Sequence, residues 1–137
     1  MHIISYLKLP AEIANLNRVI EFVSGTAAKE GFPPKKILEI ELATEEVFVN
    51  ICNYAYAEDK GEAEISLKLD ANKNLVIEIA DSGVPFNILE KEDPDIAADI
   101  ESRSIGGLGI FFIKKTMDSV NYRRENDKNI LSLTVLR

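Results

Sequence analysis

The fold is decided by residues 62–80, EAEISLKLDANKNLVIEIA, in which two apolar segments flank a short polar one. From Glu62 to Leu69 polar and apolar residues alternate, which is the period of a β-strand with one buried and one exposed face. Residues 70–74, DANKN, have the composition of a turn, and residues 75–80, LVIEIA, form a second apolar segment. We therefore expect an antiparallel hairpin here.

The flanking segments predict further strands and helices, with no repeat or linker that would divide the chain. Strands are expected at residues 3–9, 122–125 and 130–136, and helices at 10–30, 33–56 and 107–120. Gly31 is expected to end the first helix, and Pro33 and Pro34 to begin the second. The sequence predicts one α+β domain over residues 1–137, a two-layer α/β sandwich whose mostly antiparallel sheet is covered by helices on one face.

The composition excludes several classes of function. The 137 residues include 16 Lys and Arg against 23 Asp and Glu, a net charge of −7, which disfavours direct binding of a nucleic acid backbone. The apolar runs, such as residues 110–113, are too short to span a membrane. Cys52 is the one cysteine, and the first residues lack the pattern of a signal peptide, so we expect a cytoplasmic protein.

The second helix carries a stripe of polar residues. At roughly 100° per residue, Glu39, Glu46, Asn50 and Asn53 fall on one side of it, between apolar flanks. Glu46 and Asn50 lie one turn apart, so a carboxylate and an amide oxygen converge on one ligand, and such oxygen ligands suit Mg²⁺. The alternative, that these are ordinary surface residues of an amphipathic helix, stays open from the helix alone.

Two later motifs have the chemistry of a nucleotide site. Asp81 ends an apolar strand and is followed by Gly83, which allows a flat ligand to approach closely. Residues 106–109, GGLG, precede a helix, where free amides and the helix dipole favour phosphate. Taken singly, each motif has an alternative explanation, an ordinary turn for the first and a flexible hinge for the second.

In this order, the motifs resemble those of the ATPase superfamily that unites DNA gyrase B, MutL and the histidine-kinase catalytic domain (GHKL). The N box of that superfamily is similar to residues 46–50, EVFVN, the G1 box to residues 81–86, DSGVPF, and the G2 box to residues 106–109. The short length and residues 108–118, LGIFFIKKTMD, look most like the anti-sigma-factor serine kinases of the RsbW type.

The resemblance implies that ATP binds between the helical layer and a lid at residues 87–105. Asp81 would accept a hydrogen bond from the adenine amino group, and Gly83 would let the ring lie close. Asn50 would be a ligand of Mg²⁺. Glu46 would be the general base that takes the proton of a substrate serine.

The resemblance implies further binding residues. The segment formed by Gly106, Gly107, Leu108 and Gly109 would bind phosphate oxygens through its amides. Thr134 would contact the adenine side through water, and Asn53 would face the phosphates. At position 54 this chain has tyrosine where many kinases of the group have histidine.

The resemblance also implies partners. The expected activity is transfer of the γ-phosphate to a serine of an anti-anti-sigma (STAS-type) protein, together with sequestration of a sigma factor, in a protein that pairs as a homodimer. Two alternatives stay open: a nucleotide-gated binding module without phosphotransfer, and a detached histidine-kinase catalytic domain. The predicted lid has six acids and two bases, a net charge of −4, and we expect its acids to point away from the phosphates.

Overall fold

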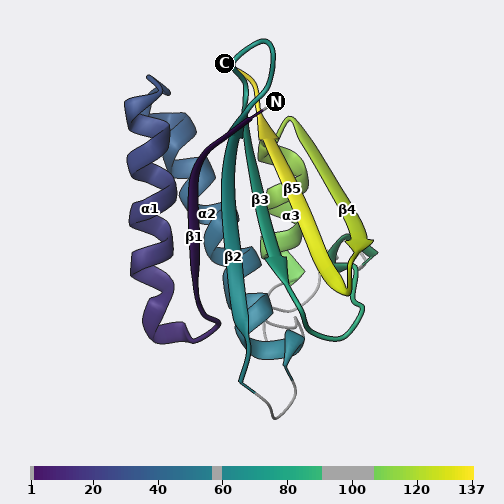
Figure 1. Ribbon diagram of the computed structural model, residues 1–137. Coiled ribbons are helices and arrows are strands. Elements are labelled where there is room, and N and C mark those ends of the chain that lie inside the picture. The colour runs from purple at the N-terminus through teal and green to yellow at the C-terminus, as the bar shows by residue number, and fades with distance from the viewer. Residues whose placement is uncertain (1, 57–59, 91–106) are drawn as a thin grey trace.

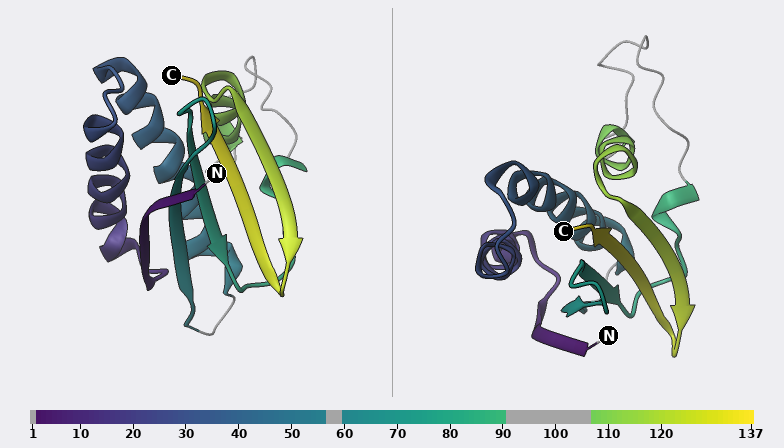
Figure 2. Two further views of the ribbon diagram at one scale, coloured as in Figure 1. Left: turned by 45° about the horizontal axis from the view of Figure 1, so that its top comes forward. Right: turned by 90° about the horizontal axis from the view of Figure 1, so that it is seen from above.

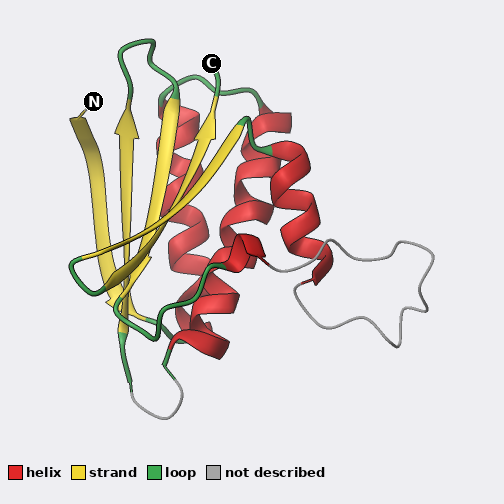
Figure 3. Ribbon diagram, turned by 90° about the vertical axis from the view of Figure 1, so that its right-hand side faces the viewer, coloured by secondary structure: helices red, strands yellow, loops and turns green. Residues whose placement is uncertain are grey.

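Helices cover one face of a five-stranded sheet in the computed structural model of this chain (Figure 1). The structure describes residues 2–56, 60–90 and 107–137. The strand order is β1-β2-β3-β5-β4, and every neighbouring pair is antiparallel. Figures 2 and 3 show the helices in one layer and the strands in the other. The predicted α/β sandwich with an antiparallel sheet is therefore confirmed.

The elements follow the order expected from the sequence. The strands are β1 (His2–Pro10), β2 (Glu62–Leu69), β3 (Leu75–Asp81), β4 (Ser119–Glu125) and β5 (Lys128–Val135). The α-helices are α1 (Leu16–Lys29), α2 (Pro34–Asn50) and α3 (Gly107–Thr116). Short turns of other helical types are η1 (Ile13–Asn15), η2 (Ile51–Ala55) and η3 (Ile88–Glu90). The hairpin predicted from residues 62–80 is the pair β2–β3.

The alternation of side chains along the strands divides the sheet into a face toward the helices and an open face. In β2, Ala63, Ile65 and Leu67 are buried, whereas the residues between them are only half-buried. The same alternation continues across the paired positions of β3 and β5. The largest fully buried side chains come from both layers: Leu9, Val19, Ile40, Phe48, Ile65, Leu67, Leu75, Ile77, Ile79, Ile110, Ile113 and Leu133.

The first helix begins later than its apolar spacing predicts. Pro10 is the last residue of β1, where it pairs with Glu62, and α1 begins only at Leu16. Ile13 lies in the preceding turn and is 52% exposed, so it is not part of the buried face. The predicted end of α1 is confirmed: Gly31 follows it with φ +86°, the left-handed conformation typical of the residue after a helix.

The other two helices end earlier than predicted. The α-helical part of α2 stops at Asn50 and continues as the π turn η2 instead of running to Tyr56. The helix α3 ends at Thr116 instead of Val120, because Val120 pairs with Leu133 in the sheet. Strand β4 therefore begins at Ser119, three residues before the predicted start, since pairing with β5 decides its length.

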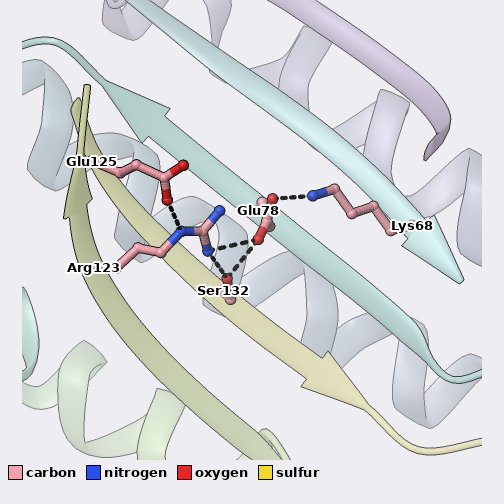
Figure 4. A network of polar contacts seen from close by, with 5 residues as sticks. All are labelled: Lys68, Glu78, Arg123, Glu125 and Ser132. Carbon is pink, nitrogen blue, oxygen red and sulfur yellow. Dashed lines mark hydrogen bonds and ion pairs between the residues drawn. The ribbon is translucent and has the colours of Figure 1, made fainter. Parts of the chain in front are cut away.

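A polar network centred on Glu78 lies on the open face of the sheet (Figure 4). Its carboxylate accepts hydrogen bonds from Lys68 Nζ at 2.5 Å, Arg123 Nη1 at 2.9 Å and Ser132 Oγ at 3.0 Å. Arg123 Nε also donates to Glu125 at 3.0 Å. Burial by itself raises the pKa of Glu78, but the hydrogen bonds from Arg123, Lys68 and Ser132 outweigh it and lower the pKa to about 2.

From this network we expect the free energy of unfolding to depend on pH in the acid range. Because the pKa of Glu78 falls from its ordinary 4.5 to about 2 in the folded chain, its contribution is complete above pH 4.5 and is lost as the pH falls toward 2. We expect Glu78→Gln to be less stable than wild type at pH 7, with the difference shrinking below pH 4.5. Urea unfolding at a series of pH values measures this.

The matched control is Glu125→Gln, which alters an acid of the same network whose side chain is 56% exposed. Exposed ion pairs contribute little to stability, so this variant should keep the wild-type pH dependence. A stability difference between Glu78→Gln and wild type that stays constant from pH 7 to pH 2 would contradict the role of Glu78.

Candidate functional site

A pocket opens between the C-terminal half of α2 and the ends of β3 and β5. One wall comes from α2 and the turn that follows it, and the other from the sheet and the segment after β3. Most of the lining is apolar, with a few polar groups that face one another, as is typical of ligand sites. The lining residues are Val47, Asn50, Ile51, Tyr54, Ala55, Ile79, Asp81, Val84, Phe86, Ile88, Tyr122, Asn129 and Leu131.

Glu46 and Asn50 meet on the same side of α2, as their spacing predicts. Asn50 Nδ2 donates to Glu46 Oε1 at 2.9 Å and to the backbone oxygen of Glu46 at 2.7 Å. The opposite orientation of the amide would place its oxygen against two acceptors, so the hydrogen bonds fix which atom is Nδ2. The amide of Asn50 thus orients the carboxylate of Glu46.

The other atom of this amide has the properties of a metal ligand. Asn50 is 6% exposed, and its Oδ1 is buried without a hydrogen-bond partner among the described residues. A buried oxygen without a partner costs free energy, which a bound cation or water would relieve. One amide oxygen fits Mg²⁺ because this ion keeps several waters and takes its other ligands from phosphates.

Gly109, in the first turn of α3, packs directly against Glu46. A Cβ atom added at Gly109 would lie 2.1 Å from Glu46 Cδ and 2.2 Å from Glu46 Oε2. Any side chain at this position would therefore displace the carboxylate. The sequence suggests this glycine for its phosphate-binding amide; the structure gives it a second role, which is to leave room for Glu46.

Asp81 lies at the end of β3 on the face of the sheet toward the helices, and it is 6% exposed. Its Oδ1 accepts hydrogen bonds from the backbone N–H of Gly83 and from Asn129 Nδ2, both at 2.9 Å. None of the described residues donates a hydrogen bond to Oδ2. Among the described residues, the hydrogen bonds to this carboxylate are thus made to Oδ1, and Asp81 lines the pocket.

Gly83 is required by the backbone next to it. A Cβ atom here would lie 2.1 Å from the carbonyl oxygen of Ala55 and 2.6 Å from its carbonyl carbon. The same carbonyl accepts a hydrogen bond from the N–H of Val84 at 3.1 Å. The segment after β3 therefore lies directly on the end of η2, and close approach of the two backbones explains the glycine without any ligand.

The structure places Thr134 on the opposite face of the sheet from Asp81. Thr134 pairs with Val76, on the open face, whereas Asp81 pairs with Asn129, on the face toward the helices. The polar residue of β5 that contacts Asp81 is Asn129, which lies between the predicted strands 122–125 and 130–136. One signal could have found it: Asn129 is in phase with Leu131, Leu133 and Val135, the buried residues of that strand.

Asn53 leaves the stripe that the sequence predicts. It lies in η2, where a π turn advances each residue by less than an α-helix does, and its side chain is exposed. Glu39, Glu46 and Asn50 precede this turn and keep their helical spacing.

Tyr54 lines the pocket and is 49% exposed. Burial raises the pKa of the Cys52 thiol to about 11, so it stays protonated at neutral pH.

The glycine-rich segment is described in part. Gly107 and Leu108 belong to the backbone of the first turn of α3, as does Gly109. Gly106 and residues 91–105, which make up most of the predicted lid, lie outside the described residues. The prediction that the lid acids point outward therefore stays a prediction.

Among the helices of the described residues, none is long and apolar enough to cross a membrane.

Known proteins with related sequences or folds show the family of this chain. Residues 9–135 match the histidine kinase-like ATPase domain family. The chain is 32% identical over 129 residues to the serine-protein kinase RsbW of Bacillus thuringiensis (strain Al Hakam), a match that covers 91% of this chain and 80% of that protein. It is 31% identical, with the same coverage, to the serine-protein kinase RsbW of Bacillus cereus (strain AH187).

Among solved structures, the histidine kinase domain of the blue-light activated histidine kinase from Erythrobacter litoralis EL346 has a TM-score of 0.56 and 16% identity. That match covers 90% of this chain and 59% of the solved chain, and it concerns the fold alone. Fold and motifs together define a GHKL-type ATPase domain. The chain belongs to the histidine kinase-like ATPase domain family, and its sequence relatives named above are serine-protein kinases.

The packing of Gly83 on Ala55 predicts a stability effect. Gly83→Ala places a methyl group on the Ala55 carbonyl, so we expect a loss of about 1–3 kcal/mol in the free energy of unfolding. The control is Gly25→Ala in the middle of α1, where a Cβ meets nothing within 4 Å. Removing a helical glycine should raise stability by about 0.5–1 kcal/mol. Chemical unfolding measures both, and a neutral Gly83→Ala would contradict the packing.

Proposed function

We propose that this protein is an ATP- and Mg²⁺-dependent protein serine kinase that transfers the γ-phosphate to a serine of an anti-anti-sigma (STAS-type) protein. The family membership supports ATP as the nucleotide, and the names of the relatives support a serine as the acceptor. We further propose that the protein sequesters a sigma factor, that it pairs as a homodimer and that it acts in the cytoplasm. Detection of a complex with the sigma factor, and its release by the anti-anti-sigma protein, would test the regulatory part.

The observation that carries the catalytic part is the pair formed by Glu46 and Asn50. Glu46 is oriented by the Asn50 amide, which donates to Oε1 at 2.9 Å, and it is packed against Gly109 at the start of α3. A base fixed in this way, beside the segment proposed to bind phosphate, is suited to take a proton from an attacking serine hydroxyl. The proton would move from the serine oxygen to the Glu46 carboxylate as the γ-phosphoryl group is transferred.

The binding part rests on Asp81, Asn50 and the start of α3. The Asp81 carboxylate would accept a hydrogen bond from the adenine amino group at one end of the pocket. Asn50 Oδ1 would be the protein ligand of Mg²⁺, which neutralises phosphate charge when it is bound. The amides of Gly106, Gly107, Leu108 and Gly109 would receive the phosphate oxygens, as the dipole at a helix start favours.

Glu46→Gln tests the proposed base. Glutamine retains an oxygen that accepts the hydrogen bond from Asn50, but it does not take a proton at neutral pH. We expect ATP binding to change little and phosphate transfer to fall at least about 100-fold. The assay is incubation with γ-labelled ATP, Mg²⁺ and a purified candidate anti-anti-sigma protein, with phosphoserine identified on that protein.

The control is Glu45→Gln, which removes a neighbouring acid on the exposed side of α2 and should retain transfer. ATP binding by the wild type without transfer to any serine would overturn the kinase and leave the nucleotide-gated binding module. Undiminished transfer by Glu46→Gln would overturn the role of Glu46 alone.

Asn50→Ala tests the proposed metal ligand. We expect the enhancement of ATP binding by Mg²⁺, measured as the ratio of Kd without and with the ion, to fall at least about tenfold, since the one proposed protein ligand is lost. Binding measured in EDTA gives the reference for each variant. An enhancement equal to that of the wild type would exclude Asn50 as a ligand of the ion.

A further inference from the structure

The side chain of Asn129 makes hydrogen bonds with every part of its amide, and these join three segments at the pocket. Its Nδ2 donates to Asp81 Oδ1 at 2.9 Å and to the carbonyl of Val84 at 2.8 Å. Its Oδ1 accepts from the Tyr122 hydroxyl at 2.6 Å and from the N–H of Phe86 at 3.2 Å. Asn129 is 6% exposed, so its side chain is buried, and its four hydrogen-bond partners are groups of the protein itself.

The partners allow only one orientation of the amide. The backbone N–H of Phe86 is a donor and must face the Asn129 oxygen, whereas the Val84 carbonyl and the Asp81 carboxylate are acceptors and must face Nδ2. An aspartate here would place an oxygen against both acceptors, and a threonine has one hydroxyl for four partners. The site therefore requires an asparagine, in a position set by the pairing of Asp81 with Asn129 across β3 and β5.

The hydrogen bond from Asn129 to Asp81 determines which oxygen of the carboxylate a ligand would contact. Asn129 and the N–H of Gly83 both donate to Oδ1, so a nucleotide base bound in the pocket would donate to Oδ2. A fixed carboxylate oxygen prefers a base that presents an N–H donor, such as the 6-amino group of adenine, over one that presents an acceptor, such as the 6-oxygen of guanine. The difference in affinity between the two kinds of base is larger when the Asp81 carboxylate is held more rigidly.

We infer that Asn129, supported by the Tyr122 hydroxyl, is a positioning residue that fixes the Asp81 carboxylate and thereby sets the preference of the pocket for a purine with a 6-amino group. The inference rests on the proposed function in one respect, that the pocket binds ATP. Tyr122 acts on Asp81 indirectly, because its hydroxyl donates a hydrogen bond to Asn129 and not to Asp81 itself. Tyr122 also lines the same pocket. Neither residue needs to touch the nucleotide for this role.

The test compares two nucleotides that differ only at the 6-position, ATP and purine riboside triphosphate, which lacks the amino group. In Asn129→Ala we expect ATP to bind about tenfold more weakly, while the affinity for purine riboside triphosphate changes less than about twofold. Tyr122→Phe retains the Phe86 contact to Asn129, so we expect a loss of about two- to threefold for ATP alone. A purely structural role would weaken both nucleotides equally.

The control is Asn121→Ala, the same substitution at an exposed residue of β4 that pairs with Ser132 on the open face. It should leave both affinities unchanged. Equal losses for the two nucleotides in Asn129→Ala, or no loss, would overturn the inference. If that variant does not fold, an unchanged affinity ratio in Tyr122→Phe would overturn it instead. Failure of the wild type to bind ATP would overturn the proposed function itself, a result distinct from the others.

Discussion

The site depends on the contact between the end of the helix layer and the end of β3. The Ala55 carbonyl accepts the N–H of Val84, and Gly83 lies so close to the same peptide that a Cβ atom would not fit. A second link is the Tyr56 hydroxyl, which accepts the N–H of Ser82 and donates to the carbonyl of Glu62, both at 2.7 Å. Because both contacts hold backbone groups of the segment after β3, that segment keeps a fixed spacing from η2 and the residue that follows it.

In the candidate site, an asparagine side chain donates a hydrogen bond to each of the two carboxylates, Glu46 and Asp81. Asn50 Nδ2 donates to Glu46 and Asn129 Nδ2 donates to Asp81, each at 2.9 Å. A neutral amide orients a carboxylate without cancelling its charge, which an arginine or lysine in the same place would do. On the open face of the sheet, by comparison, Glu78 forms ion pairs with Lys68 and Arg123, and we expect this network to contribute to the stability of the fold.

Much of the site could be predicted because it depends on local periods. Glu46 and Asn50 are one turn apart in an unbroken helix, and Asp81 ends a strand whose alternation is clear, so the sequence predicts the elements that carry these three residues. Asn53 and Thr134 were not brought to the group, because their placement depends on longer-range effects. A π turn changes the direction of Asn53, and the register of β5 against β3 places Thr134 on the other face.

By itself the sequence determined the class of fold, the β2–β3 hairpin, the helix that carries Glu46 and Asn50, and the limits set by a net charge of −7. These follow from periodicity and composition, which need no knowledge of distant contacts. Only the tertiary structure decided that Asn129 meets Asp81, that Gly109 leaves room for Glu46 and that Gly83 fits beneath Ala55. Each of these depends on two segments far apart in the chain, and close packing brings them within atomic contact.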